Sequence, residues 1–152
     1  MSFHRPHMRL VVIDLIPALL SWEGRNRSTS LEMAPDGPDA IAHLYSHYRL
    51  IGLADADVSS TAIRKALEDN RATEFFDSVG TSGGFGPAIN PRVIRRITRM
   101  SRTHEPVVFV TGRESLGRLM SRSRVGVVLT TREEFGAVPD AVASLISGRV
   151  SP

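Results

Sequence analysis

Side chains able to carry out acid–base, metal or phosphoryl-transfer chemistry follow three short apolar runs of this chain. Asp14 ends the first run, Asp55 follows the second, and the segment 111–114 (Thr-Gly-Arg-Glu) follows the third. A carboxylate can bind a metal ion, attack phosphorus or move a proton, and a guanidinium can bind phosphate or pair with a carboxylate. A buried charge is costly unless its strand delivers it to a cleft, so each position is a candidate for a functional site.

Three other patterns are open to a functional reading, but a structural reading is favoured for each. The glycine-rich segment Gly80–Gly86 is interpreted as a flexible turn, because it lacks the spacing of known phosphate-binding loops. His43 and His47 stand four residues apart but have no third ligand, so we expect a solvated or half-buried pair. Asp55 and Asp57 precede Ser-Ser-Thr, and a helix N-cap is favoured over a metal site.

The elements that must position these residues are short strands alternating with amphipathic helices. Continuous, β-branched apolar runs predict buried strands at residues 9–15, 50–54, 106–110 and 125–129, with a further short one near 75–79. Helical spacing of apolar residues predicts helices that start near residues 36–39, 57–60, 90–91, 114 and 138. The first of these helices is expected to carry one apolar face: Ile41, Leu44, Tyr45 and Tyr48. Residues 17–35 are expected to form a long irregular connection.

This alternation predicts an α/β fold of three layers, α/β/α, with a Rossmann-like parallel sheet that carries helices on both faces. In such sheets the carboxyl ends of the strands converge and form the ligand site. Asp14, Asp55 and the segment 111–114 are therefore expected to lie close together.

Length and composition are those of an ordinary globular protein. The 152 residues, 41% of them apolar, suffice for one domain, which we expect at residues 9–147 between flexible termini at 1–8 and 148–152. No apolar run approaches the roughly 20 residues that span a bilayer, so no membrane partner is expected. The chain has no cysteine, which excludes disulfides and thiolate metal ligands, and we expect a cytoplasmic protein.

Arginine is the unusual component, with 18 arginines against the single lysine Lys65. A GC-rich genome accounts for the preference as such, yet residues 90–124 carry a local charge of +7. Five arginines form what we call the basic face of the helix expected after residue 90: Arg92, Arg95, Arg96, Arg99 and Arg102. This face is either simply solvated or docks an acidic protein or another anionic partner. Nucleic acid is a weaker candidate because aromatic side chains for base stacking are absent nearby.

An apolar strand that ends in Asp14 is followed by a long loop, a helix and the letters Tyr-Arg-Leu-Ile-Gly at residues 48–52. A later strand reads Val-Val-Phe-Val-Thr-Gly at 107–112, and a closing helix reads Pro-Asp-Ala-Val-Ala-Ser-Leu at 139–145. Over roughly residues 9–147 this layout resembles the haloacid dehalogenase (HAD) superfamily. The loop after the first strand is too short for a cap domain, so the resemblance implies a capless form with an open cleft.

The resemblance implies phosphoryl transfer in which Asp14 matches the nucleophile that forms an aspartyl-phosphate. It implies an acid/base aspartate two residues later and Mg²⁺ held by the first motif and by acidic residues of the last. It also implies a serine or threonine after the second strand and a basic residue at a later helix. The chain has Ile16 at the acid/base position, Ala54 (next to Asp55) at the hydroxyl position and Gly86 at the basic position. Loss of the acid/base alone lowers a hydrolysis rate by about 10²–10⁴.

The last motif departs from the family pattern too. Where an acidic pair is implied, the chain has Thr111, Gly112, Arg113 and Glu114, of which only Glu114 is a possible metal ligand. Arg113 brings a cation near the position of magnesium, and an ion pair between Arg113 and Asp14 is expected to replace the metal contact.

These departures favour a HAD-like protein with degenerate catalytic motifs that has lost phosphohydrolase activity and binds a partner or ligand. No cofactor and no metal are then expected. One alternative is a Mg²⁺-dependent phosphohydrolase with Asp14 as nucleophile, an acid supplied by Asp55 or Glu114, and Mg²⁺ held by Asp14 and Glu114. A second alternative is a Rossmann-like regulatory or interaction module unrelated to phosphotransfer.

Overall fold

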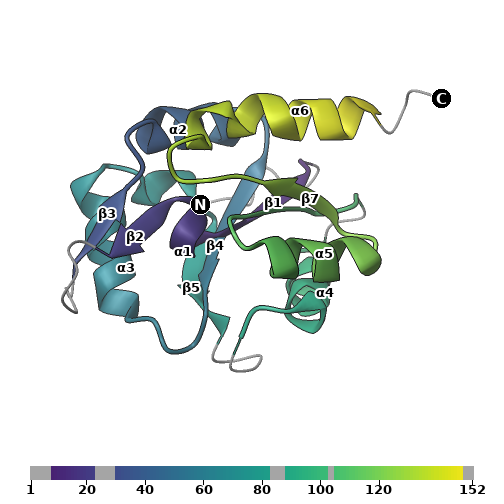
Figure 1. Cartoon of the computed structure of the whole chain (residues 1–152), viewed down its shortest axis with the longest axis horizontal. Coiled ribbons are helices and arrows are strands. Elements are labelled where there is room, and N and C mark those ends of the chain that lie inside the picture. The colour runs from purple at the N-terminus through teal and green to yellow at the C-terminus, as the bar shows by residue number, and fades with distance from the viewer. Residues whose placement is uncertain (1–7, 23–29, 83–87, 103–104, 149–152) are drawn as a thin grey trace.

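The computed structural model of the chain describes residues 8–22, 30–82, 88–102 and 105–148. Its centre is a parallel sheet in the order β5-β4-β1-β6-β7 (Figure 1). The strands are β1 (Leu10–Asp14), β4 (Arg49–Ala54), β5 (Ser78–Thr81), β6 (Val108–Thr111) and β7 (Gly126–Leu129). Since every neighbouring pair in this sheet is parallel, all five strands have their carboxyl ends at the same edge.

Helices cover both faces of the sheet and complete the three layers (Figure 1). The helices are α2 (Gly37–Tyr45), α3 (Ser60–Asp69), α4 (Pro91–Met100), α5 (Glu114–Arg122) and α6 (Val138–Gly148). Helices α2, α3 and α6 bury their apolar stripes on one face of the sheet, in what we call the main core. Helices α4 and α5 bury theirs in a second core on the opposite face. Strand β1 supplies both cores by alternation, with Val11 and Ile13 on one side and Leu10 and Val12 on the other. This central position explains why the run is apolar without interruption.

The helix starts depend on local capping that the sequence predicts. The Asn90 side chain accepts a hydrogen bond from the Val93 N–H over 3.0 Å, and Pro91 occupies the first turn of α4. At α3 the cap is Ser59, whose hydroxyl accepts from the Ala62 N–H over 3.2 Å. The capping role expected for Asp55 and Asp57 is therefore wrong, because Ser59 stands at the position whose side chain reaches the free N–H groups.

The connection between the first strand and the first long helix is more regular than predicted. A short helical turn, α1 (Leu15–Ala18), leads into an antiparallel pair, β2 (Leu20–Trp22) with β3 (Leu31–Met33). Ala34 then donates its N–H to the Leu19 carbonyl over 2.8 Å. For the described residues of this connection, 17–22 and 30–35, the expectation of an irregular course is wrong, and residues 23–29 lie outside the described ones. Burial of Leu20, Leu31 and Met33 in the main core stabilises strands that are too short to show a period of their own.

Smaller differences concern where elements end. Helix α2 ends at Tyr45, so Tyr48 lies in the following turn, where its N–H donates to the Leu44 carbonyl. The strand expected near 75–79 begins at Ser78, so Gly80 belongs to β5.

Some predicted features fall partly or wholly beyond the described residues. Gly86 lies outside them, as do the termini predicted as flexible at 1–8 and 148–152, apart from Met8 and Gly148. Across the described ranges, no helix combines the length and apolarity that crossing a membrane requires.

Candidate functional site

Three neighbouring strands bring the candidate site together at the carboxyl edge of the sheet. Strand β1 lies between β4 and β6, so Asp14 at its end lies between Asp55, which follows β4, and Thr111, the last residue of β6. Asp14 is completely buried, whereas the side chain of Asp55 is 25% exposed. The order of the strands thus places two carboxylates at one position, one inside the molecule and one at its surface.

Arg113 bridges the two carboxylates. Its Nε donates to Asp14 Oδ2 over 2.9 Å and its Nη2 to Asp14 Oδ1 over 3.0 Å, a bidentate contact. Its Nη1 donates to Asp55 Oδ2 over 2.8 Å, and Nη2 also lies 3.4 Å from Asp55 Oδ1. The ion pair that the sequence predicts between Arg113 and Asp14 is present, and Asp55 extends it to a cluster of three charges. We call Asp14, Asp55 and Arg113 the charge cluster.

Neighbouring backbone and hydroxyl groups hold Arg113 in place. The Thr111 hydroxyl donates to Asp14 Oδ2 over 2.7 Å and accepts the backbone N–H of Arg113 over 3.0 Å. Between them, Gly112 passes so close to the turn after β1 that an added Cβ would lie 3.1 Å from Pro17 and 3.2 Å from the Thr130 carbonyl. Glycine therefore lets the backbone after β6 approach the turn after β1, which orients Arg113 toward Asp14.

Asp55 is held on its other side by the segment that leads into α4. The backbone N–H of Ile89 donates to Asp55 Oδ1 over 2.9 Å. Each of the four carboxylate oxygens in the charge cluster therefore accepts a hydrogen bond from an N–H group. Buried charges are stable only when they are paired and hydrogen-bonded in this way.

The pKa values in the cluster follow from burial and pairing. Burial raises the pKa of Asp14 above its ordinary value, with Arg113 and Thr111 opposing the rise. Partial burial acts to raise the pKa of Asp55 as well, but the hydrogen bonds from Arg113 and Ile89 outweigh it and lower that pKa. Burial acts to lower the pKa of Arg113, and the two carboxylates reverse this and raise it, so the guanidinium stays charged.

The residues present do not fit a magnesium site. The guanidinium of Arg113 contacts the oxygens of both Asp14 and Asp55 with which a cation would have to bind. The side chain of Glu114 is 74% exposed and pairs with Arg118 one turn along α5, over 3.0 Å. No group of three or more histidine, cysteine, aspartate or glutamate side chains in the described part of the chain could hold a metal ion.

Two other predicted cleft residues, Ile16 and Ala54, have apolar side chains. Ile16 packs against the main core, and Ala54 is buried within it. Gly86 lies outside the described residues. The five arginines of the basic face are all exposed, but Arg102 lies beyond the end of α4 with a left-handed backbone (φ 55°) rather than on the helix.

The sequence places Asp55 among the candidate residues at this edge, because it directly follows a strand in a parallel sheet. It predicts a helix cap for Asp55, however, and not the contact with Arg113 that the structure shows. The part of the site that sequence reasoning misses is the Ile89 N–H. Nothing in the sequence near residue 89 indicates a backbone donor aimed at the site.

Solved structures with similar folds identify the architecture. A haloacid dehalogenase-like family hydrolase from Xanthomonas campestris superposes with a TM-score of 0.70 at 12% identity, covering 94% of this chain and 99% of that one. The chain has a HAD-like fold. A putative beta-phosphoglucomutase from Thermotoga maritima superposes at 0.66, with 13% identity and coverage of 89% and 100%.

A third neighbour, a haloacid dehalogenase-like family hydrolase from Streptococcus pneumoniae, has a TM-score of 0.65 at 12% identity and coverage of 91% and 98%. No protein-family model matches the sequence, and no curated protein does. The similarity is therefore one of fold, and the chemistry of the HAD-like fold in this chain has to be argued from its own residues.

Proposed function

We propose that this chain is a HAD-like protein that does not hydrolyse phosphate esters and acts by binding a partner. The observation that carries the proposal is the bridge of Arg113 between Asp14 and Asp55. A guanidinium in this position satisfies the two carboxylates without a metal ion, and it is covalently part of the chain. The cluster thus stabilises the carboxyl edge of the sheet.

Charge supports this proposal. The three side chains of the cluster carry a net charge of −1, because two carboxylates surround one guanidinium. A phosphate dianion that approaches Asp14 is repelled by Asp55, while the donors of Arg113 are directed at the carboxylates. Phosphoryl transfer needs cationic or N–H groups aimed at the developing charge on the phosphoryl oxygens.

Proton transfer also has no evident donor at the implied position. Ile16, two residues after Asp14, has an apolar side chain that packs against the core. Glu114 points into solvent and pairs with Arg118, and both oxygens of Asp55 accept hydrogen bonds. A leaving group would therefore depart without general-acid assistance, which accounts for a loss of about 10²–10⁴.

A phosphatase assay tests this proposal. Purified chain is incubated with Mg²⁺ and either acetyl phosphate or p-nitrophenyl phosphate, beside Asp14→Asn prepared in the same way. We expect the same phosphate release from both proteins. Release that is well above background and abolished by Asp14→Asn overturns the proposal and favours a Mg²⁺-dependent phosphohydrolase with Asp14 as nucleophile.

A further inference from the structure

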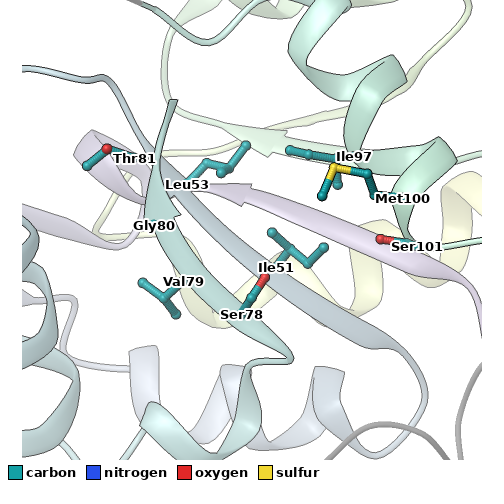
Figure 2. Close-up of a pocket in the computed structure, with 9 residues that line it drawn as sticks. All are labelled: Ile51, Leu53, Ser78, Val79, Gly80, Thr81, Ile97, Met100 and Ser101. Carbon is teal, nitrogen blue, oxygen red and sulfur yellow. The ribbon is translucent and has the colours of Figure 1, made fainter. Parts of the chain in front are cut away.

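A groove lies between the edge strand β5 and helix α4, on the face of the sheet away from α3 and α6. Ile51 and Leu53 of β4 form its floor, and Ile97 and Met100 of α4 form one wall. Figure 2 shows these side chains beside the β5 ribbon, which borders the groove opposite α4. Met100 is 69% exposed although it is apolar, so the groove presents an apolar surface to solvent.

The size of the groove suits one side chain of a larger partner. Its volume is about 190 Å³, below the roughly 300–1,000 Å³ of pockets that hold complete small molecules. Gly80 of β5 lines it, and a Cβ added there would meet no atom within 4 Å. Space for an apolar side chain therefore exists directly beside the backbone of β5.

Strand β5 offers backbone hydrogen-bonding groups next to this space. Among the described residues it pairs only with β4, so its other edge has no strand neighbour there. Its sequence, Ser-Val-Gly-Thr, has none of the charged residues or prolines that commonly protect an edge. An extended peptide adds to such an edge through main-chain hydrogen bonds while pockets select alternate side chains.

Helix α4 lines the groove with Ile97 and Met100, and the rest of its surface is rich in arginine. Five arginines and no acidic residue occur between Pro91 and Arg102, and Arg92, Arg95 and Arg99 form no ion pair with another described residue. An acidic partner is complementary to this charge.

The end of the groove is already fixed in the free protein. The buried guanidinium of Arg49 donates to Asp77 Oδ2 over 2.9 Å and to the Ser101 carbonyl over 3.0 Å. These contacts tie β4 to the residue before β5 and to the residue that follows α4. A groove held in this way does not have to be ordered when a partner binds, which favours affinity.

We propose that an acidic peptide segment binds here in extended conformation as an additional strand beside β5. One apolar side chain enters the groove next to Gly80, and acidic side chains two residues away on the same face of the strand contact the arginines of α4. This inference deepens the proposed function, on which it rests, by naming the surface and the chemical class of the partner.

Fluorescence anisotropy with a labelled peptide tests the inference. The probe is Glu-Thr-Glu-Thr-Val-Thr-Glu-Thr-Glu, and its two matched controls replace the central valine by glycine or all glutamates by lysine. We expect the probe to bind, the glycine version to bind about tenfold more weakly because it buries no side chain, and the lysine version not to bind. Binding of the probe should weaken as salt rises, since the arginines are exposed.

Two pairs of variants locate the site. Gly80→Leu fills the groove and should weaken binding at least tenfold. Gly148→Leu, at another described glycine where an added Cβ would meet no atom within 4 Å, should leave binding unchanged. The double change Arg92→Glu with Arg99→Glu should weaken binding at least tenfold. The change Arg64→Glu, at an exposed position of α3 on the opposite face of the sheet, should not. Circular dichroism confirms that each variant is folded.

Several outcomes overturn the inference. They are absence of probe binding, equal binding of the lysine peptide, and full affinity in folded Gly80→Leu. A single-stranded oligonucleotide that binds more tightly than the probe and is insensitive to Gly80→Leu assigns the arginines to nucleic acid instead. Phosphatase activity that depends on Asp14, together with intact peptide binding, contradicts the proposed function alone, so the two failures are distinguishable.

Discussion

Replacing Arg113 by methionine is the most direct perturbation of the charge cluster. Arg113→Met keeps an unbranched apolar stem and removes the guanidinium, so Asp14 loses the cation that pairs with it. The side chain of Asp14 is 1% exposed and keeps only the Thr111 hydroxyl among its side-chain partners. Asp55 keeps the Ile89 N–H and access to water. The change therefore leaves Asp14, rather than Asp55, as the buried charge without compensation.

The expected loss of stability is about 3 kcal/mol. Removal of one partner from a buried ion pair typically costs about 3–5 kcal/mol, because the other charge remains buried without compensation. The lower end applies here for two reasons. The side chain of Arg113 is 32% exposed, so water screens the pair, and burial already raises the pKa of Asp14, which eases its protonation in the variant. A loss of 3 kcal/mol is large against the roughly 5–15 kcal/mol that stabilises a domain.

Urea unfolding followed by circular dichroism measures this loss. The matched control is Arg118→Met in α5, the helix that begins after Arg113, where the exposed pair with Glu114 contributes at most about 0.5 kcal/mol. Adding Asp14→Asn to Arg113→Met should recover part of the loss, because the uncompensated charge is then absent. If Arg113→Met lowers the free energy of unfolding no more than Arg118→Met does, the charge cluster does not stabilise the fold.

Two further changes give expected outcomes in the same unfolding assay. Asp55→Asn should lower the free energy of unfolding by about 1–2 kcal/mol near pH 6. Because the pKa of Asp55 is lowered in the folded state, its contribution to stability is fully present above the ordinary pKa of about 4 and is lost as pH falls through the folded value. The difference in stability between wild type and variant should therefore shrink on acidification, and a constant difference contradicts this. Arg124→Gly should stabilise the chain by about 0.5–1 kcal/mol, since Arg124 follows α5 with a left-handed backbone (φ 65°) that glycine adopts without strain, while Arg118→Gly inside α5 should destabilise it by about 1 kcal/mol; a loss of stability in Arg124→Gly contradicts this account.

The sequence contained enough to predict the main elements of the fold. Strand β1 is a continuous apolar run because it is buried on both faces, and such a run is recognisable without a structure. The start of α4 was predictable from Asn90 and Pro91, since capping is local in sequence. The pair β2 and β3 was not, because three-residue strands take their stability from distant contacts that no local pattern encodes.

The candidate site also contains predictable and unpredictable contacts. The contact between Asp14 and Arg113 was predictable because Asp14 ends one strand, Arg113 comes soon after another, and a parallel sheet brings these strand ends together. The position of Asp55 at this edge was predictable in the same way, but its neighbours in sequence favour a cap, so its contact with Arg113 was not. Contacts that involve backbone groups, such as the Ile89 N–H, carry no residue-type signal and require the structure.

The distribution of charge separates the two regions of interest in this HAD-like fold. At the carboxyl edge of the sheet, Asp14, Asp55 and Arg113 satisfy one another and leave a net charge of −1. Around α4, five arginines stand without an acidic residue among them. An anion that diffuses toward the protein is attracted to α4 rather than to the position at which a phosphoryl group would meet Asp14. Electrostatics therefore favours a binding role for the helix face, and it disfavours the edge at which the HAD resemblance alone would lead one to expect chemistry.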